Sequence, residues 1–282
     1  MKNKGLIITL IVILSTFVIG LVVGLVLLLR NGDMINFNFN LGNKKMNLID
    51  SYEALPFEVN KIYLNLYSTD VEIKESTNGD VLVEYYSNRN NNAKVEFVDN
   101  IIKVDESEYD VSCFGICNTR RKVVIYVPNT YKGLFDLNTR SGDISSKTDL
   151  SNNSIEVETS SGDVYFSQTG VITISTKSGD IKINKVFKDG TLSSLSGDIV
   201  LDEVLKRIII STSSGDVRID KLEIVTNSSI STSSGDVYIS NNKSNCYVET
   251  KTSSGDALIN KSNRKSDLVL KINTSSGDII VK

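Results

Sequence analysis

One five-residue motif recurs through the second half of the chain: a hydroxyl residue, any residue, and then Ser-Gly-Asp. Its hydroxyl residues are Thr139, Thr159, Thr176, Ser194, Thr212, Thr232, Thr252 and Thr274. Its glycines are Gly142, Gly162, Gly179, Gly197, Gly215, Gly235, Gly255 and Gly277, at intervals of 20, 17, 18, 18, 20, 20 and 22 residues. A repeat this short cannot bury an apolar face alone, so the motif predicts a fold built by stacking successive repeats.

Apolar and polar residues alternate on both sides of the motif. In one copy, Ile155 and Val157 precede Thr159, and Val164 follows the aspartate. A period of two indicates strands with one buried face, so each repeat is expected to hold two strands of about five residues on either side of a tight corner. Counting by twos from Ile155 places first Thr159 and then Ser161 on the inward side, with the glycine making the bend.

We therefore predict an all-β fold, a β-solenoid in which two-strand repeats of about 18–20 residues stack as in a parallel β-helix or β-roll. A sandwich of hairpins is the alternative, because Gly-Asp also suits a two-residue II′ turn. The repeat domain is expected to span residues 51–282, with regular repeats in 136–282 and degenerate ones in 51–135. In the degenerate part Thr69 replaces a glycine, and Asn78 replaces a serine before Gly79.

The first 50 residues have a different character. Residues 5–29 form an uncharged stretch of 25 residues, long enough as a helix to cross a hydrocarbon core of about 30 Å. We predict an uncleaved anchor in residues 1–30 and a juxtamembrane linker in 31–50. A cleaved signal peptide is the alternative, but it has a shorter apolar region and a small-residue cleavage site. Lys2 and Lys4 favour a cytoplasmic N-terminus, which predicts a single-pass cell-membrane protein with an extracellular repeat domain.

Charge and cysteine content narrow the possible partners. The chain has 31 Lys+Arg and 34 Asp+Glu, so it lacks the basic excess of a nucleic-acid-binding protein. Cys113 and Cys117 form a C-x3-C pair that suits a small disulfide loop, with two free thiols as the alternative; a metal there would need further ligands, and the chain has no histidine. Cys246 is in phase with Val248 and Thr250, which predicts a buried thiol.

The aspartates of the motif are the candidate functional residues, and stacking would align them in a column about 4.8 Å apart. We expect them to accept hydrogen bonds that stabilise the corners. A ladder that binds cations is an alternative, although one carboxylate per coil offers few ligands. No metal, cofactor or catalytic residue is predicted, since every aspartate occupies the same position and none is singled out. The column comprises Asp143, Asp163, Asp180, Asp198, Asp216, Asp236, Asp256 and Asp278.

Several features together resemble a known family. They are the N-terminal anchor, the degenerate first half, the I-x-V-P segment ending at Pro128, and the tandem T-x-S-G-D-[IV]-x-[IV] repeats. From about residue 50 to 282 the chain is similar to the bacterial putative-adhesin domain of unknown function with β-strand repeats, which also occurs in Lia-type envelope-stress proteins. The resemblance implies an extracytoplasmic β-solenoid-like domain in a Gram-positive bacterium and no catalytic residues.

Function is then expected to be binding or scaffolding at the cell envelope, as an adhesin or an envelope-stress accessory, with an envelope protein or a glycan as ligand. Mechanisms that use Ser-His-Asp or Cys-His need histidine, so the enzymatic alternative is a carbohydrate-active β-helix that uses paired carboxylates. The sequence stops at Ile279-Ile280-Val281-Lys282 directly after a corner. We expect that coil to be uncapped and to offer strand edges for self-association.

Overall fold

The computed structural model describes residues 45–89, 93–106 and 119–282, and residues 45–282 form one compact unit. The predicted anchor at 5–29 and the Cys113/Cys117 pair lie outside the described residues. Within those residues the regular elements are all strands, and no helix has the length and apolar character needed to cross a membrane. The strands are β1 (Asn47–Ala54), β2 (Lys61–Leu66), β3 (Asp70–Glu75), β4 (Val81–Ser87), β5 (Val95–Val98), β6 (Ile101–Asp105), β7 (Arg121–Val127), β8 (Leu134–Thr139), β9 (Ile144–Thr159), β10 (Val164–Ser175), β11 (Ile181–Val186), β12 (Asp189–Ser194), β13 (Ile199–Val204), β14 (Arg207–Thr212), β15 (Val217–Leu222), β16 (Ser228–Ser231), β17 (Val237–Ile239), β18 (Tyr247–Lys251), β19 (Ala257–Ile259), β20 (Val269–Asn273) and β21 (Ile279–Val281).

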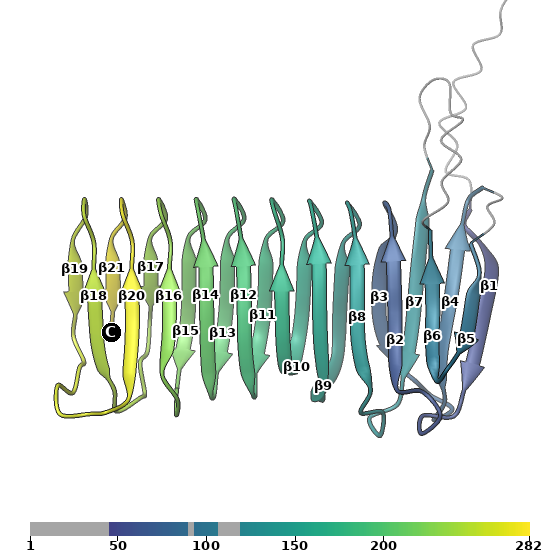
Figure 1. The fold of residues 1–282 in the computed structure, drawn as a ribbon, viewed down its shortest axis with the longest axis horizontal. Coiled ribbons are helices and arrows are strands. Elements are labelled where there is room, and N and C mark those ends of the chain that lie inside the picture. Colours follow the sequence, from purple (N-terminus) through teal and green to yellow (C-terminus); the bar gives the residue numbers. More distant parts are fainter. Residues whose placement is uncertain (1–44, 90–92, 107–118) are drawn as a thin grey trace, which may run out of the picture. The chain divides into compact units, whose positions relative to one another are not determined.

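These strands stack in two layers that face each other across the core (Figure 1). Layer I runs β5-β6-β2-β8-β9-β10-β12-β14-β16-β20-β18. Layer II runs β1-β4-β7-β3-β9-β10-β11-β13-β15-β17-β21-β19. The long strands β9 and β10 bend between the layers and belong to both.

Each Ser-Gly-Asp corner carries the chain from layer I to layer II. The two strands that flank a corner do not pair with each other; each pairs in parallel with the equivalent strand of the neighbouring coil, as Val164 does with Ile144 and Ile181. This pattern confirms the all-β, solenoid-like stack and rules out the sandwich of hairpins. The alternating apolar residues form continuous buried rows between the layers, as predicted, and Cys246 lies among them at 1% exposure.

The N-terminal coils depart from the repeat. β4 pairs antiparallel with both β1 and β7, and β5 pairs antiparallel with β6. Gly79 has a φ of 90° and open space around it, so Asn78-Gly79-Asp80 is an isolated turn and not a degenerate corner of the stack. Strand structure also begins earlier than expected, at Asn47.

At the far end of the stack, the order of the coils differs from their order in the sequence. The coil formed by β20 and β21 lies between the coil of β16 and β17 and the coil of β18 and β19. The prediction that Ile279–Val281 forms an uncapped end is therefore wrong, because β21 has a partner strand on each side. The free end of the stack is the β18–β19 coil, and self-association stays a prediction.

Candidate functional site

The predicted aspartate column exists, and its bonding shows what it does. The backbone N–H of each column aspartate donates a hydrogen bond to the carboxylate of an aspartate in the neighbouring coil. The distances are 2.8–3.1 Å, starting with Asp143 N–H to Asp70 Oδ1 and ending with Asp256 N–H to Asp278 Oδ1. The carboxylates are exposed, and no group of metal-ligating side chains occurs among the described residues. The aspartates thus join one coil to the next.

The hydroxyl residue and the glycine of the motif complete the corner. In six coils the hydroxyl oxygen accepts the glycine N–H three residues later, as Thr212 Oγ1 does from Gly215 at 3.1 Å. In these six coils the hydroxyl is therefore the group that closes the turn from within. A Cβ on Gly215 would lie 2.0 Å from the Gly197 carbonyl oxygen, so the coils stack this closely only with glycine. Thr159 is buried as predicted, whereas Ser161 is exposed, because the chain bends at it and the alternation stops.

Glu106 replaces the missing corner above the first coil. Its buried carboxylate accepts the Thr69 hydroxyl at 2.7 Å, the Tyr85 hydroxyl at 2.5 Å and the Tyr67 N–H at 2.8 Å. Thr69 is possible in the glycine position because this carboxylate, and not another glycine corner, lies against it. Nothing in the repeat pattern pointed to Glu106.

A groove of about 490 Å³ opens on the outward face of layer I, across β2, β8 and β9, and we call it the tyrosine groove. Alternation along β2 buries Ile62, Leu64 and Leu66 and turns Tyr63 and Asn65 outward. The residues lining the groove are Tyr63, Asn65, Leu66, Tyr67, Asn138, Thr139, Arg140, Glu158, Thr159 and Ser160. Tyr63 lies on β2 and Tyr67 directly follows its last residue, so the two tyrosines are four positions, or at most about 13 Å, apart along the chain.

Planar polar groups fill the space between the two rings. Asn65 and Asn138 are neighbours in register, and so are Asn138 and Glu158. Asn65 Nδ2 donates to Asp105 Oδ1 at 3.0 Å, and Asn138 Nδ2 donates to Asp136 Oδ1 at 2.8 Å. Each amide is fixed by its NH₂ group and presents its carbonyl oxygen as an acceptor.

The charges around the tyrosine groove nearly cancel. Lys61 pairs with Asp136 at 2.6 Å and Lys103 with Asp105 at 3.0 Å, and the bond to Asp105 raises the pKa of Lys103. The Arg140 guanidinium lies 4.7 Å from the centroid of the Tyr67 ring and donates to its hydroxyl.

Glu158 completes the lining of the groove from β9. Its carboxylate is exposed and has no hydrogen-bond or ion-pair partner within the described part of the chain. Because aspartates neutralise Lys61 and Lys103, the groove offers hydrogen-bonding groups and aromatic surface but carries little net charge.

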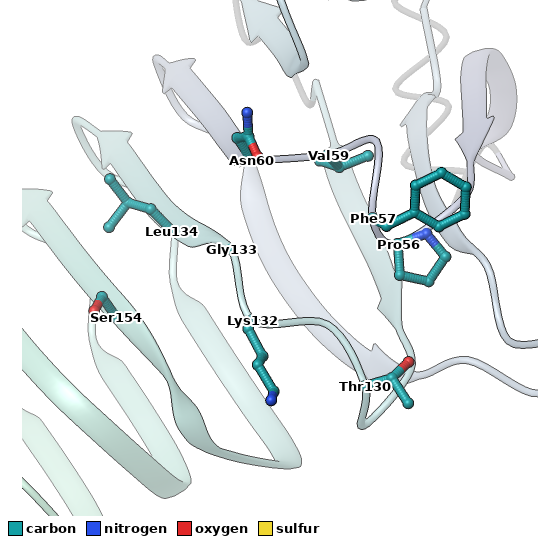
Figure 2. Close-up of a pocket in the computed structure, with 9 residues that line it drawn as sticks. All are labelled: Pro56, Phe57, Val59, Asn60, Thr130, Lys132, Gly133, Leu134 and Ser154. Carbon is teal, nitrogen blue, oxygen red and sulfur yellow. The ribbon is translucent and has the colours of Figure 1, made fainter.

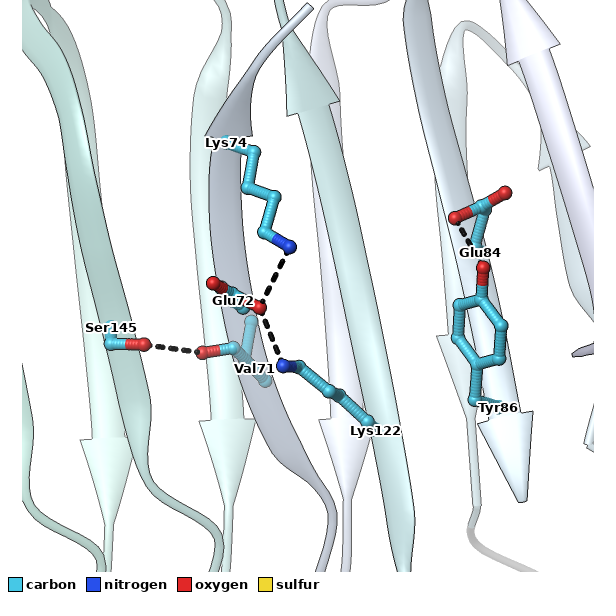
Figure 3. A network of polar contacts seen from close by, with 7 residues as sticks. All are labelled: Val71, Glu72, Lys74, Glu84, Tyr86, Lys122 and Ser145. Carbon is cyan, nitrogen blue, oxygen red and sulfur yellow. Dashed lines mark hydrogen bonds and ion pairs between the residues drawn. The ribbon is translucent and has the colours of Figure 1, made fainter. Parts of the chain in front are cut away.

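The outward face of layer II carries a polar network of another kind (Figure 3). Glu72 bridges Lys122 at 2.5 Å and Lys74 at 3.1 Å, and the Tyr86 hydroxyl donates to Glu84 at 2.7 Å. That bond raises the pKa of Tyr86 to about 12. Partial burial alone would raise the pKa of Glu72, but the hydrogen bonds from Lys122 and Lys74 outweigh it and lower the pKa. These groups satisfy one another by hydrogen bonds and ion pairs.

A second hollow, of about 560 Å³, lies at the other ends of β2 and β8 (Figure 2). Phe57, 79% exposed, and Pro56 form one side of it, and Lys132 is the charged residue in its lining. The Tyr131 hydroxyl is buried behind Gly133 without a hydrogen-bond partner, and burial raises its pKa well above the usual range. This hollow has fewer converging polar groups than the tyrosine groove, which is the better candidate site.

Comparison with known proteins places the fold. The model of one protein family, Toastrack DUF4097, matches residues 59–282. The chain belongs to the Toastrack DUF4097 family. No curated protein matches this Toastrack chain.

Solved structures with a similar arrangement have low sequence identity to this Toastrack chain. A proposed cell adhesion protein from Clostridium sporogenes shares 12% identity over 84% of this chain and 98% of its own, with a TM-score of 0.28. A proposed adhesin from Bacteroides fragilis shares 13% over 85% and 98%, with a TM-score of 0.44. A proposed lipid-binding protein from Parabacteroides distasonis shares 15% over 86% and 98%, with a TM-score of 0.46.

Sequence reasoning found the backbone ladder of this Toastrack domain but missed its groove. In the coils from β10 to β16, one outward row of layer I is formed by small hydroxyl residues such as Ser175, Ser193 and Ser211. The signal that was available is the pair of tyrosines Tyr63, on β2, and Tyr67, directly after it, beside the outward amides Asn65 and Asn138.

Proposed function

We propose that this Toastrack protein is a membrane-anchored, extracytoplasmic binding protein of the cell envelope that holds its ligand in the tyrosine groove. The uncharged 25-residue stretch at 5–29 and the lysines before it support a single-pass anchor with a cytoplasmic N-terminus. A role as an adhesin or as an accessory of Lia-type envelope-stress signalling in a Gram-positive bacterium fits that topology. The protein binds its ligand and does not convert it.

The observation that carries this proposal is a hollow on the outward face of layer I with a tyrosine near each end and paired amides between. A glycan is the ligand that such a site suits, because aromatic rings pack on the apolar faces of sugars while amide and carboxylate oxygens accept their hydroxyl hydrogens. Paired lysines and aspartates leave no excess charge for a polyanion. We therefore propose a neutral or N-acetylated envelope oligosaccharide that lies along β2 and β8.

Rigidity of the groove supports tight binding. Arg140 holds the Tyr67 ring, and Asp105 and Asp136 hold the two amides, so few side chains lose freedom when a ligand binds.

Binding of the full chain to a panel of neutral, N-acetylated and phosphate-containing envelope glycans tests this function. We expect Tyr67→Ala to weaken binding about tenfold, or about 1.4 kcal/mol, through loss of the ring. Tyr67→Phe keeps the ring and should retain more of the affinity. Thr191→Ala on the same face of layer I, away from the groove, is the matched control. Equal binding by Tyr67→Ala and Thr191→Ala would rule out the groove as the site.

The same panel decides the enzymatic alternative. Glu158 is an exposed carboxylate in the groove, and Asp136 lies nearby on β8, so glycan cleavage by paired carboxylates has residues to use. Asp136, however, is already bound by Lys61 and Asn138. Our proposal predicts intact glycans after prolonged incubation. Turnover that Glu158→Gln abolishes would replace the binding function with a hydrolytic one.

A further inference from the structure

The inserted coil of residues 269–281 carries an inference that is independent of the groove. From β8 to β17, each coil stacks on the coil that precedes it in the chain. The chain then crosses one coil position between β17 and β18, forms the end coil, and returns through residues 260–268 to fill the vacant position with β20 and β21 (Figure 1). We call this position, between the β16–β17 coil and the β18–β19 coil, the slot; β20 and β21 fill it and pair with the strands on both sides.

Contacts that hold the inserted coil are those of the repeat itself. Asp278 N–H donates to Asp236 Oδ1, and Asp256 N–H donates to Asp278 Oδ1, both at 2.8 Å. The Thr274 hydroxyl donates to the Gly235 carbonyl at 3.2 Å. Leu270, Ile272, Ile279 and Val281 are fully buried between the neighbouring coils. None of these contacts depends on which copy of the chain supplies the coil.

Only residues 260–268 connect the end coil to the inserted one. This segment is largely exposed and polar, and it lies against the outer edge of β18 through a few hydrogen bonds. Asn263 N–H donates to the Cys246 carbonyl at 2.9 Å, and Val248 N–H donates to Ser262 Oγ at 2.9 Å. When the connection opens, little apolar surface is exposed as long as the slot stays occupied.

We propose that the β20–β21 coil is exchangeable between two copies of this chain, so that each copy fills the slot of the other in a reciprocal dimer. Exchange of an identical element conserves all the contacts inside the slot and changes only the course of the connection. An empty slot would expose buried rows on both sides, so exchange is expected only where a second copy is close. Anchoring in one membrane would supply that proximity.

Cysteines at register partners across the slot report the exchange. Ser229 on β16 and Lys271 on β20 are paired on the outward face, and neighbouring parallel strands bring such positions within disulfide range. Two tagged full-length chains, one S229C and one K271C, are co-expressed with Cys113 and Cys117 changed to serine. Mild oxidation and non-reducing gels then measure the mixed disulfide. A single chain with both substitutions serves as the stacking control.

The matched control is S193C on one chain and S211C on the other, which are register partners in coils that do not exchange. We expect the mixed S229C and K271C disulfide to exceed this control at least tenfold. Three results would overturn the proposal: no mixed product while the doubly substituted chain closes internally, an equal yield from the control pair, or failure of the doubly substituted chain to close. The first result would show that the β20–β21 coil stays in the slot of its own chain. The second would show that mixed disulfides form by general contact between the outward faces of two chains. The third shows that β16 and β20 are not neighbours.

Discussion

Replacing Asp198 by asparagine or by alanine separates the two roles that a repeated aspartate can have. Asp198 Oδ1 accepts the N–H of Asp216 at 2.9 Å, and its own N–H donates to Asp180 Oδ1 at 2.9 Å. Asparagine keeps an acceptor at the same place and removes the charge. Alanine removes both the acceptor and the charge.

In Asp198→Asn the loss of hydrogen-bond energy and the relief of charge repulsion nearly cancel, whereas in Asp198→Ala they do not. At about 4.8 Å in water each neighbouring carboxylate repels by about 0.9 kcal/mol, and physiological salt reduces the sum over two neighbours to about 1 kcal/mol. A hydrogen bond to a charged acceptor contributes about 1.5–3 kcal/mol and one to a neutral acceptor about 0.5–1.5. Asp198→Asn should therefore change the free energy of unfolding by less than about 0.5 kcal/mol, because the weaker bond is offset by relief of repulsion. Asp198→Ala should cost about 1 kcal/mol.

Urea unfolding of residues 45–282, followed by circular dichroism, measures both variants at 0.15 M and 1 M NaCl. High salt screens most of the remaining repulsion in the wild type, so each substitution should cost about 0.6 kcal/mol more there. A metal chelator should leave the wild type unchanged. If Asp198→Asn is as destabilising as Asp198→Ala, and the chelator lowers wild-type stability, the column holds a cation and the backbone role argued here fails.

Three further predictions follow from single contacts. Gly215→Ala places a methyl group 2.0 Å from a backbone oxygen and should cost about 3 kcal/mol in urea unfolding, against less than about 0.5 for exposed Ser214→Ala; equal effects would refute the close-packed corner. The lowered pKa of Glu72 gives stability that is present above its ordinary value of 4.5 and lost as pH falls, so Glu72→Gln should flatten the acid side of the stability profile, and an unchanged slope would exclude it. The Tyr86 phenol should titrate near pH 12 in a spectroscopic titration and shift towards 10 in Glu84→Gln, which a profile insensitive to Glu84 would contradict.

The regular coils were predictable because the apolar alternation, the glycine spacing and the residue type at the corner all indicate the same stacked coil. Period-two alternation fixes which side chains are buried, and the spacing of Gly197, Gly215 and Gly235 fixes the coil length. Only glycine allows the carbonyl contact between coils, so the residue type at that position reports the stacking directly. The inward phase of Cys246 followed from the same alternation and is confirmed by its burial.

The repeat that made the coils predictable also concealed their order. Ile230, Ile272 and Thr250 occupy the same register position in three coils, so the sequence pattern is satisfied equally well by either stacking order of the last two. What differs is the course of the connections 240–246 and 260–268, which have no periodicity. The repeat pattern therefore specifies the structure of each coil but not which coil it stacks on. Because the coils are equivalent in this way, a coil from another copy of the chain could occupy the same position.

The tyrosine groove occurs where the repeat breaks down, and the break explains it. A regular coil needs a glycine corner, and in the coils from β10 to β16 one outward row of layer I holds small hydroxyl residues, at Ser175, Ser193, Ser211 and Ser231. The first coil has Thr69 in the corner, which is possible because Glu106, and not a glycine corner, lies against it from the neighbouring coil. Released from the repeat, this coil carries Tyr63 and Tyr67 on its outward face, beside Asn138 of the first regular coil. Glu106→Gln weakens the acceptor that holds the Tyr67 N–H and the Thr69 hydroxyl, so it should lower both the stability of the first coil and the glycan affinity of the groove. Loss of stability with unchanged affinity would show that the groove does not depend on the substitute corner.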